Sequence, residues 1–329
     1  MKTLNLKVDP NKPNIKIIEI AASLIKGGEA VAFPTETVYG VGANAWDETA
    51  VRRVFAAKVR SMDNPLLIHV WSWAQAEELV ADLPEEVDLL VQKFWPGPLT
   101  LVARANPEIP ELVRAGLPTV GLRMPDHRVA LELIRVAGVP VAATSANLSG
   151  RPSPTRAEHV KTDLNGRIAA IVDGGITGWG IESTILDVSR RPFAVLRPGA
   201  VSRERLEEVI PGLLAESRPS GGTASNLPHY QPSARVIPVK HGEPVQEIAQ
   251  SEIAKGMRVG VVAVTAQDMP AELEMAVVIR GGSPEYGRQL YEIFRTADRR
   301  KIDCLVMEMP PEVGLGVAVA DRIYEAARR

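Results

Sequence analysis

Residues 30–40 of this chain read Ala-Val-Ala-Phe-Pro-Thr-Glu-Thr-Val-Tyr-Gly, a short apolar run followed by a polar loop. The apolar run predicts a buried strand, and Pro34 ends it because proline has no N–H for the strand ladder. A helix is predicted just before it, since apolar residues recur at helical spacing from Asn14 to Ile25. Helix, strand and polar loop in this order indicate an α/β fold, in which ligands bind where strands give way to loops.

The same alternation continues outward along the chain. We predict a helix over residues 47–59 and another that begins at the capping box Ser72–Gln75. Strands are predicted at residues 66–70, 99–103, 119–123, 139–144, 168–172, 183–188 and 194–197.

A turn-rich stretch without apolar periodicity separates a second set of elements. It predicts three parts: a domain over residues 1–212, a linker over 213–236 and a second domain over 237–329. In the second domain, strands at 258–264, 276–279 and 302–307 alternate with helices at 245–254, 284–296 and 317–327. This pattern predicts a small Rossmann-like α/β domain.

Length and composition are those of an ordinary globular protein. The chain has 329 residues, 45% hydrophobic and 24% charged, and a formal net charge of −2. That charge argues against a surface built throughout for nucleic acid, although it is compatible with a local basic cleft. The single cysteine, Cys304, lies in a strand-like run that favours a buried structural thiol over a nucleophile. No segment has the length of a membrane span or the core of a signal peptide, so we expect a cytoplasmic protein.

Several catalytic signatures are missing from the sequence. It contains no Gly-x-x-x-x-Gly-Lys-Ser/Thr loop, no Gly-x-Ser-x-Gly elbow and no His-Glu-x-x-His pair. The glycines of residues 174–180 do not keep the spacing of a dinucleotide fingerprint and predict a turn. The usual P-loop, serine hydrolase and zinc protease mechanisms are therefore disfavoured.

Polar loops that carry cations follow many of the predicted strands. Lys58, Arg60, Arg123 and Arg197 would supply four positive charges to one cleft if these loops converge. Arginine forks match the geometry of phosphates and carboxylates, so the cleft would hold small anionic groups.

Plainer interpretations fit several of the same residues. Lys58 and Arg60 also fit a solvated helix end, where cations complement the helix dipole. Ser145 and Asn147 also fit a helix cap or a turn. His69, inside an apolar run, fits a hydrogen-bonded core histidine. Trp95 fits packing and turn formation, and we leave it out of the site.

Taken in order, these segments resemble the YrdC/Sua5 family, the L-threonylcarbamoyladenylate synthases of tRNA modification. The resemblance covers nearly the whole chain and implies a twisted, open, mixed sheet of YrdC type followed by the smaller α/β domain of the two-domain Sua5 type. The stretches that carry it are residues 33–40, Lys58-x-Arg60, 64–66, 94–100, 123–125, 145–150, 182–184, 196–199, 314–318 and 321–323.

The resemblance implies a nucleotidyltransferase in which L-threonine, bicarbonate and ATP give threonylcarbamoyl-AMP and pyrophosphate. The adenylate would pass, through downstream threonylcarbamoyl-transferase machinery, to adenosine 37 of tRNA. Mg²⁺ would accompany ATP, and no metal site on the protein itself is expected. The threonine site would comprise Thr37, His69, Arg123, Thr144 and Ser183, with Arg123 at the carboxylate. The ATP site would comprise Lys58, Arg60, Asn64, Thr119, Ser145, Asn147, Ser153 and Arg197, with Arg235 as a further candidate.

The chain departs from the family pattern in two places. The linker lacks a Ser-Pro-Gly-Met-Lys-Tyr-like run and keeps only the His-Tyr-Gln-Pro of residues 229–232, which puts a linker contact to ATP in doubt. Arg235 fits a replacement cation and equally a solvent-facing side chain. Val59 and Ser61 interrupt the usual Lys-Gly-Arg-Pro form, but both charges are kept, so we expect the nucleotide pocket to survive. Because a carbamate is labile in water, we expect residues 218–232 to act as a lid.

Two other functions are compatible with part of the same sequence features. Related domains form carbamoyl adenylates for other acceptors in hydrogenase maturation, but those proteins carry acylphosphatase and zinc-finger segments that this sequence lacks. A double-stranded RNA- or tRNA-binding module without catalysis would use the same cationic cleft, and the net charge of −2 opposes it. Serine in place of threonine stays open, because one methyl group is worth only about 1–3 kcal/mol of discrimination.

Overall fold

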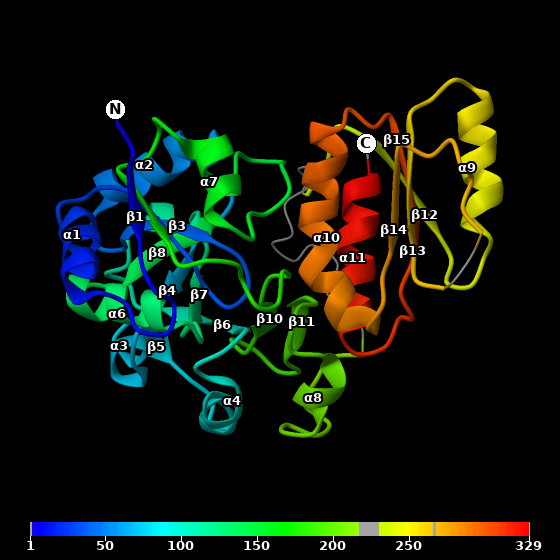
Figure 1. Ribbon diagram of the computed structural model, residues 1–329. Coiled ribbons are helices and arrows are strands. Elements are labelled where there is room, and N and C mark those ends of the chain that lie inside the picture. Colours follow the sequence, from blue (N-terminus) through cyan, green and yellow to red (C-terminus); the bar gives the residue numbers. More distant parts are fainter. Residues whose placement is uncertain (1, 217–229, 266–267, 329) are drawn as a thin grey trace. The chain divides into compact units, whose positions relative to one another are not determined.

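The computed structural model describes residues 2–216, 230–265 and 268–328 (Figure 1). These residues form two compact units. The first unit contains residues 2–149, 153–178 and 182–216, and the second contains residues 150–152, 179–181 and the described residues from 230 onward. The two short segments within residues 150–181 therefore leave the first unit and join the second.

The first unit is built on one large mixed sheet. The strand order is β1-β9-β2-β3-β8-β4-β7-β6-β10-β11, and β5 pairs with β6. In that order the strands are Leu4–Lys7, Ala170–Asp173, Val31–Phe33, Gly40–Asn44, Val141–Ser145, Leu67–His69, Thr119–Arg123, Leu99–Ala105, Thr184–Asp187 and Ala194–Arg197, and β5 is Val80–Asp82. The helices are α1 (Ile15–Lys26), α2 (Glu48–Lys58), α3 (Trp73–Glu77), α4 (Glu86–Phe94), α5 (Glu111–Arg114), α6 (Arg128–Ala137), α7 (Ala157–Leu164) and α8 (Arg203–Glu207).

Alternating side chains of this sheet build two cores. On one face, α1 and α6 pack side by side, and Val31 and Phe33 of β2 join their core (Figure 1). On the other face, Ala32 joins the core that includes α2. Both faces are buried because the central strands alternate between two apolar layers. The helices begin where the sequence offers a cap: the side chain of Asn14 accepts a hydrogen bond at the start of α1, and Asp47 does so at the start of α2.

The second unit is a four-stranded parallel sheet of order β12-β15-β13-β14. Its helices α10 and α11 lie against one face and α9 against the other (Figure 1). This confirms the predicted Rossmann-like arrangement, since parallel strands need crossover helices that cover the sheet. The strands are Arg235–Val239, Cys304–Glu308, Val259–Ala263 and Met275–Val278, and the helices are α9 (Val245–Ala254), α10 (Gly282–Arg299) and α11 (Leu315–Ala327).

The predicted α/β class and two-part organisation are confirmed, with differences in detail. Residues 40–44 form β3, which pairs with β2 and β8, although part of this segment was expected to belong to a polar loop. Near the expected linker, Phe193 pairs with Leu214 and β12 begins at Arg235, so both ends of residues 213–236 belong to folded units. Most of the lid expected at residues 218–232, including His229, lies outside the described residues.

Candidate functional site

The sheet register decides which predicted residues share an end of the sheet. Parallel strands β4 and β7 align His69 with Arg123. Strand β8 runs antiparallel to β4, which aligns His69 with Val141 and places Ser145 toward the opposite end of the strands. Four residue steps amount to about 13 Å along a strand. Register alone does not separate the two groups, however, because Phe33 aligns with Gly40 and Gly40 with Ser145. The loop that follows Phe33 nevertheless reaches Arg123 through Thr37.

Arg123 is the centre of the first group of residues. Its side chain is 5% exposed, and its Nη2 donates a hydrogen bond of 2.9 Å to Thr37 Oγ1. The loop that carries Thr37 is itself ordered, because Thr35 Oγ1 lies 2.8 Å from Thr37 Oγ1 and donates to the Val38 carbonyl at 2.7 Å. A buried guanidinium on a rigid strand is suited to hold a small carboxylate bidentately.

His69 borders Arg123 on β4 and is buried. Burial, together with the nearby charge of Arg123, lowers the pKa of His69 to about 3. The imidazole is therefore neutral near pH 7. Among the described residues its Nδ1 has no hydrogen-bond partner, while its ring meets Phe33 edge-on at 6.0 Å. The plainer interpretation of a hydrogen-bonded core histidine does not account for this unpartnered nitrogen.

Glu36 was quoted in the sequence motif but was not predicted to be a site residue. Its side chain is 9% exposed and its Oε1 lies 2.7 Å from Arg123 Nη2, so the two form a buried ion pair. Within the described part of the chain, neither carboxylate oxygen meets the geometry of a hydrogen bond. The sequence signal was a carboxylate between two threonines directly after a buried strand.

Lys58 organises a second group. It lies at the end of α2, is 1% exposed, and its Nζ donates to the carbonyls of Ser145 and Asn147. Burial lowers the pKa of Lys58 well below its usual value, and the nearby charge of Arg60 adds to this effect. The solvated helix end considered for Lys58 is therefore wrong. The lysine instead holds the loop after β8 against α2.

Arg60 leaves the helix because the chain turns sharply at Val59. Val59 has φ 52° and ψ 48°, in the left-handed region, and the Arg60 N–H donates to the Phe55 carbonyl at 3.0 Å. Arg60 Nη2 donates to the Pro65 carbonyl at 3.2 Å and its Nε lies 3.4 Å from the Asn64 carbonyl. Arg60 and Asn64 are therefore brought together.

Ser183 and Arg197 meet next to strand β6. Thr100 Oγ1 lies 2.8 Å from Ser183 Oγ, and Arg197 Nη2 donates to the Ser183 carbonyl at 2.9 Å. Thr184 of β10 aligns with Leu99 of β6, and Leu101 aligns with Leu122 of β7. This places Ser183 and Arg197 at the Arg123 end of the sheet.

The remaining predicted residues are more dispersed. Thr119 begins β7 and therefore lies at the opposite end of that strand from Arg123. Thr144 is half-buried and precedes Ser145 in β8, and the buried Ser153 donates from Oγ to Glu182 at 2.6 Å. Arg235 belongs to the second unit, where it pairs with Glu252, so it is not among the residues that the first unit assembles.

Two residues that were predicted to be structural are indeed buried. Trp95 is 7% exposed and its Nε1 donates to the Leu99 carbonyl at 2.7 Å. Cys304 is fully buried in β15, and burial raises the pKa of its thiol. Both predictions are confirmed.

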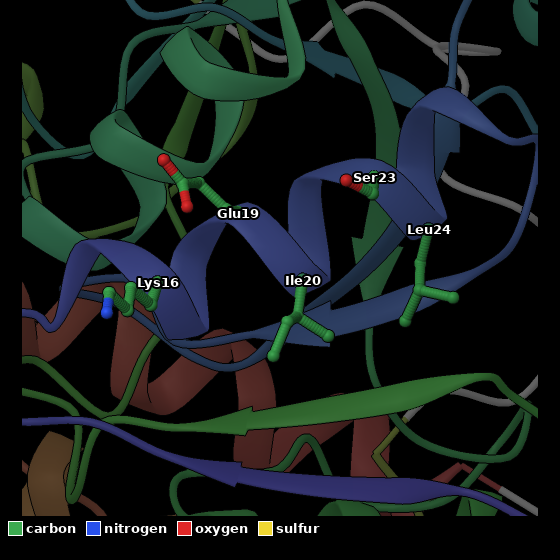
Figure 2. Close-up of a pocket in the computed structure, with 5 residues that line it drawn as sticks. All are labelled: Lys16, Glu19, Ile20, Ser23 and Leu24. Carbon is green, nitrogen blue, oxygen red and sulfur yellow. The ribbon is translucent and has the colours of Figure 1, made fainter.

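A shallow hollow on the outer face of α1 is unrelated to these groups. Figure 2 shows its lining, which is one cation, one carboxylate and short or apolar side chains from a single helix: Lys16, Glu19, Ile20, Ser23 and Leu24. None of the predicted binding residues lies there. Over the described ranges we find no cluster of three acidic, histidine or cysteine side chains that would hold a metal, and no helix long and apolar enough to cross a membrane.

The fold and these groups define a class: a two-unit α/β protein whose larger unit carries buried cations suited to small anionic ligands. A family model described as "Telomere recombination", of the Sua5, YciO and YrdC proteins, matches residues 23–199. A second model, described as the C-terminal domain of threonylcarbamoyl-AMP synthase, matches residues 201–328.

Individual relatives agree with both models. A threonylcarbamoyl-AMP synthase of Pyrococcus abyssi is 42% identical and covers 94% of each chain. The Bacillus subtilis protein of the same name is also 42% identical and covers 93% of this chain and 92% of its own. The crystal structure of P. abyssi Sua5 complexed with L-threonine matches with a TM-score of 0.91 at 39% identity, over 99% of this chain and 98% of that one. The chain belongs to the threonylcarbamoyl-AMP synthase family.

Proposed function

We propose that this protein joins L-threonine, bicarbonate and ATP to give threonylcarbamoyl-AMP and pyrophosphate. Its relatives of the same two-domain length carry the name of that reaction, and P. abyssi Sua5 has been crystallised with L-threonine. The observation that carries the proposal is the buried Arg123, which is held by Thr37 and bordered by the neutral His69. The noncatalytic RNA-binding alternative gains no support from this buried geometry.

Threonine fits the Arg123 group. Its carboxylate would bind the guanidinium, and Thr37 and Ser183 would supply hydroxyls around the remaining polar atoms. The neutral His69 would accept or donate a hydrogen bond without adding a second positive charge beside the amine.

The nucleotide fits the residues around Lys58 and Arg60. Lys58 fixes the Ser145–Asn147 loop. Arg60, which is held by the carbonyls of Asn64 and Pro65, would supply positive charge to phosphate oxygens. Arg197, beside Ser183, lies closer to the threonine group and is suited to the phosphate at which the two substrates meet. Thr119, Thr144, Ser153 and Arg235 stay predictions. Mg²⁺ would enter as part of the MgATP substrate, since Mg²⁺ is commonly held by phosphates and water rather than by a protein cage.

The chemistry requires no protein nucleophile. The amine of threonine attacks the carbon of bicarbonate and forms a carbamate. A carbamate oxygen then attacks the α-phosphorus of ATP, and the bond to the β-phosphate breaks to release pyrophosphate. Such a reaction is accelerated by holding the reactants in line and by neutralising phosphate charge, which the arginines can do. We further propose that the adenylate passes to a downstream transferase that modifies adenosine 37 of tRNA.

The test is synthesis by the purified protein from ATP, Mg²⁺, bicarbonate and L-threonine, followed as pyrophosphate release and as adenylate mass. Arg123→Lys keeps the charge but loses the fork, so the KM for threonine should rise about 10- to 100-fold, equivalent to about 1.4–2.8 kcal/mol. The KM for ATP should change less than about twofold.

The matched control is Arg128→Lys. Arg128 is the first residue of α6, is exposed and donates to the Asn11 carbonyl. Its replacement should therefore leave the KM for threonine and the KM for ATP unchanged. Product formation that does not depend on threonine, or an equal effect of the two substitutions, would contradict the proposal.

A further inference from the structure

Glu36 is a buried carboxylate that can accept more hydrogen bonds than its ion pair with Arg123 uses. The side chain is 9% exposed, and Oε1 lies 2.7 Å from Arg123 Nη2. Neither oxygen has a hydrogen-bond partner among the residues that the structure describes. A buried carboxylate has about four acceptor positions, so a donor supplied by a ligand would satisfy groups that the protein leaves open.

The charged groups around Glu36 come from two other elements. Arg123 faces it from the end of β7, and Asp126 and His127 face it from the segment that leads into α6. The partial burial of Asp126 raises the pKa of its carboxyl, and the Glu36 charge raises it further. Burial lowers the pKa of His127, and the Glu36 charge opposes that decrease. Arg123 is thus the cation closest to Glu36 in the described structure, and a second cation beside Glu36 would be favourable.

The proposed reaction supplies such a cation. Threonine is an ammonium ion near neutral pH, and its amine and carboxylate share one carbon atom. A carboxylate bound to Arg123 therefore holds the ammonium a few ångströms from the guanidinium, which is where Glu36 lies. When the substrate carboxylate competes for Arg123, two carboxylates share one guanidinium, and this favours proton transfer to one of them.

We propose that Glu36 is the general base of the first step. Its carboxylate binds the threonine ammonium and takes one proton from it. The inference rests on the proposed function. An N–H bond of the ammonium breaks and its proton goes to Glu36. The freed electron pair forms the N–C bond to bicarbonate, and the bicarbonate hydroxyl leaves with a second amine proton as water. The products are the carbamate, protonated Glu36 and water, so charge and atoms balance.

The other buried groups are less suited to this role. His69 holds a proton weakly, because its pKa is about 3. Lys58 already donates to two backbone carbonyls at the other group of residues. The nearby Asp126 is exposed and makes no contact with Arg123 or Thr37 that the structure records. Glu36 alone, among the described carboxylates, directly contacts the arginine that would hold the substrate.

The test compares wild type with Glu36→Gln, Glu36→Asp and the control Asp126→Asn in the adenylate assay from pH 7 to 9. Glu36→Gln keeps the shape and removes the base, so kcat at pH 7 should fall about 100-fold or more. In the Glu36→Gln variant only threonine with a neutral amine would react. The rate of this variant should therefore rise about tenfold per pH unit at pH values below the pKa of the amine. Wild type and Glu36→Asp should show a much shallower rise, and Asp126→Asn should stay within about threefold of wild type.

The pH slope separates catalysis from structural damage, since a merely structural role would lower activity at all pH values alike. Melting curves for each variant establish that the fold persists. If Glu36→Gln does not fold, a steep pH slope in Glu36→Asp would overturn the inference. The inference would also be overturned if the pH–rate profile of Glu36→Gln were parallel to that of wild type, or if the activity of Glu36→Gln were within about threefold of wild type. Absence of adenylate with wild type would instead refute the proposed function, so the two failures are distinguishable.

Discussion

Replacing Val59 by glycine should stabilise the protein. Val59 ends α2 with φ 52° and ψ 48°, a conformation that costs an L-residue about 1–2 kcal/mol. Glycine removes this strain but loses about 0.5–1 kcal/mol more backbone entropy on folding. The side chain is 69% exposed, so little packing is lost. The net gain should be about 0.5–1 kcal/mol, equivalent to a melting temperature roughly 1–3 °C higher.

Urea unfolding followed by tryptophan fluorescence measures this gain. Four of the five tryptophans, at positions 46, 71, 73 and 95, lie in the first unit, so the signal reports mainly on the unit that contains α2. The backbone hydrogen bonds of the turn remain available to glycine, so Arg60 keeps its position and the KM for ATP should change less than about twofold.

Ala115→Gly is the matched comparison, since Ala115 ends α5 at φ 49°. It should give a smaller gain because alanine is not β-branched. A Val59→Gly protein that is less stable than wild type would refute the strain argument. A gain at Ala115 larger than that at Val59 would refute the part assigned to β-branching.

Two further substitutions test buried ionisable groups. The folded pKa of His69, about 3, lies below its ordinary 6.5, so stability should be full above pH 6.5 and fall by about 1.4 kcal/mol per pH unit as the pH decreases toward 3. His69→Gln should reduce that acid slope in urea titrations at pH 4–7, and parallel curves would exclude this contribution. In the second unit, Glu308 accepts from the N–H groups of Gly242 and Val264 at 3.0 and 2.7 Å and is fully buried. Glu308→Gln should lower the unfolding free energy by about 2–4 kcal/mol, whereas Glu312→Gln, at an exposed position, should leave it unchanged; equal stabilities would contradict the buried-acceptor argument.

Much of the fold was predictable because it depends on local patterns. The apolar periodicity before Gly27 predicts α1, and the capping box at Ser72 predicts α3, where Ser72 Oγ accepts from the Gln75 N–H at 3.2 Å. Residues 40–44 were partly missed because a glycine-containing strand between two others lacks alternating polarity. Its identity as a strand depends on partners that are distant in the sequence.

The candidate site was predicted in composition but not in arrangement. The burial of Lys58 was not evident, because a lysine at a helix end also fits solvent exposure. The Glu36–Arg123 ion pair joins residues 87 positions apart, and no local pattern encodes it. Arg235 fitted both a replacement cation and a solvent-facing side chain, and only the structure shows that it pairs with Glu252.

The sequence by itself determined the α/β class, the two-part organisation, the residues that match the family and the chemistry those residues can offer. These follow from side-chain identity and from periodicities of two and 3.6 residues, which are local properties. Only the tertiary structure decided that β8 runs against β4 and β7, and that Arg123 contacts both Thr37 and Glu36 of the loop that follows β2. Strand direction and register are set by the summed burial and hydrogen bonding of the whole sheet, so no single segment specifies them.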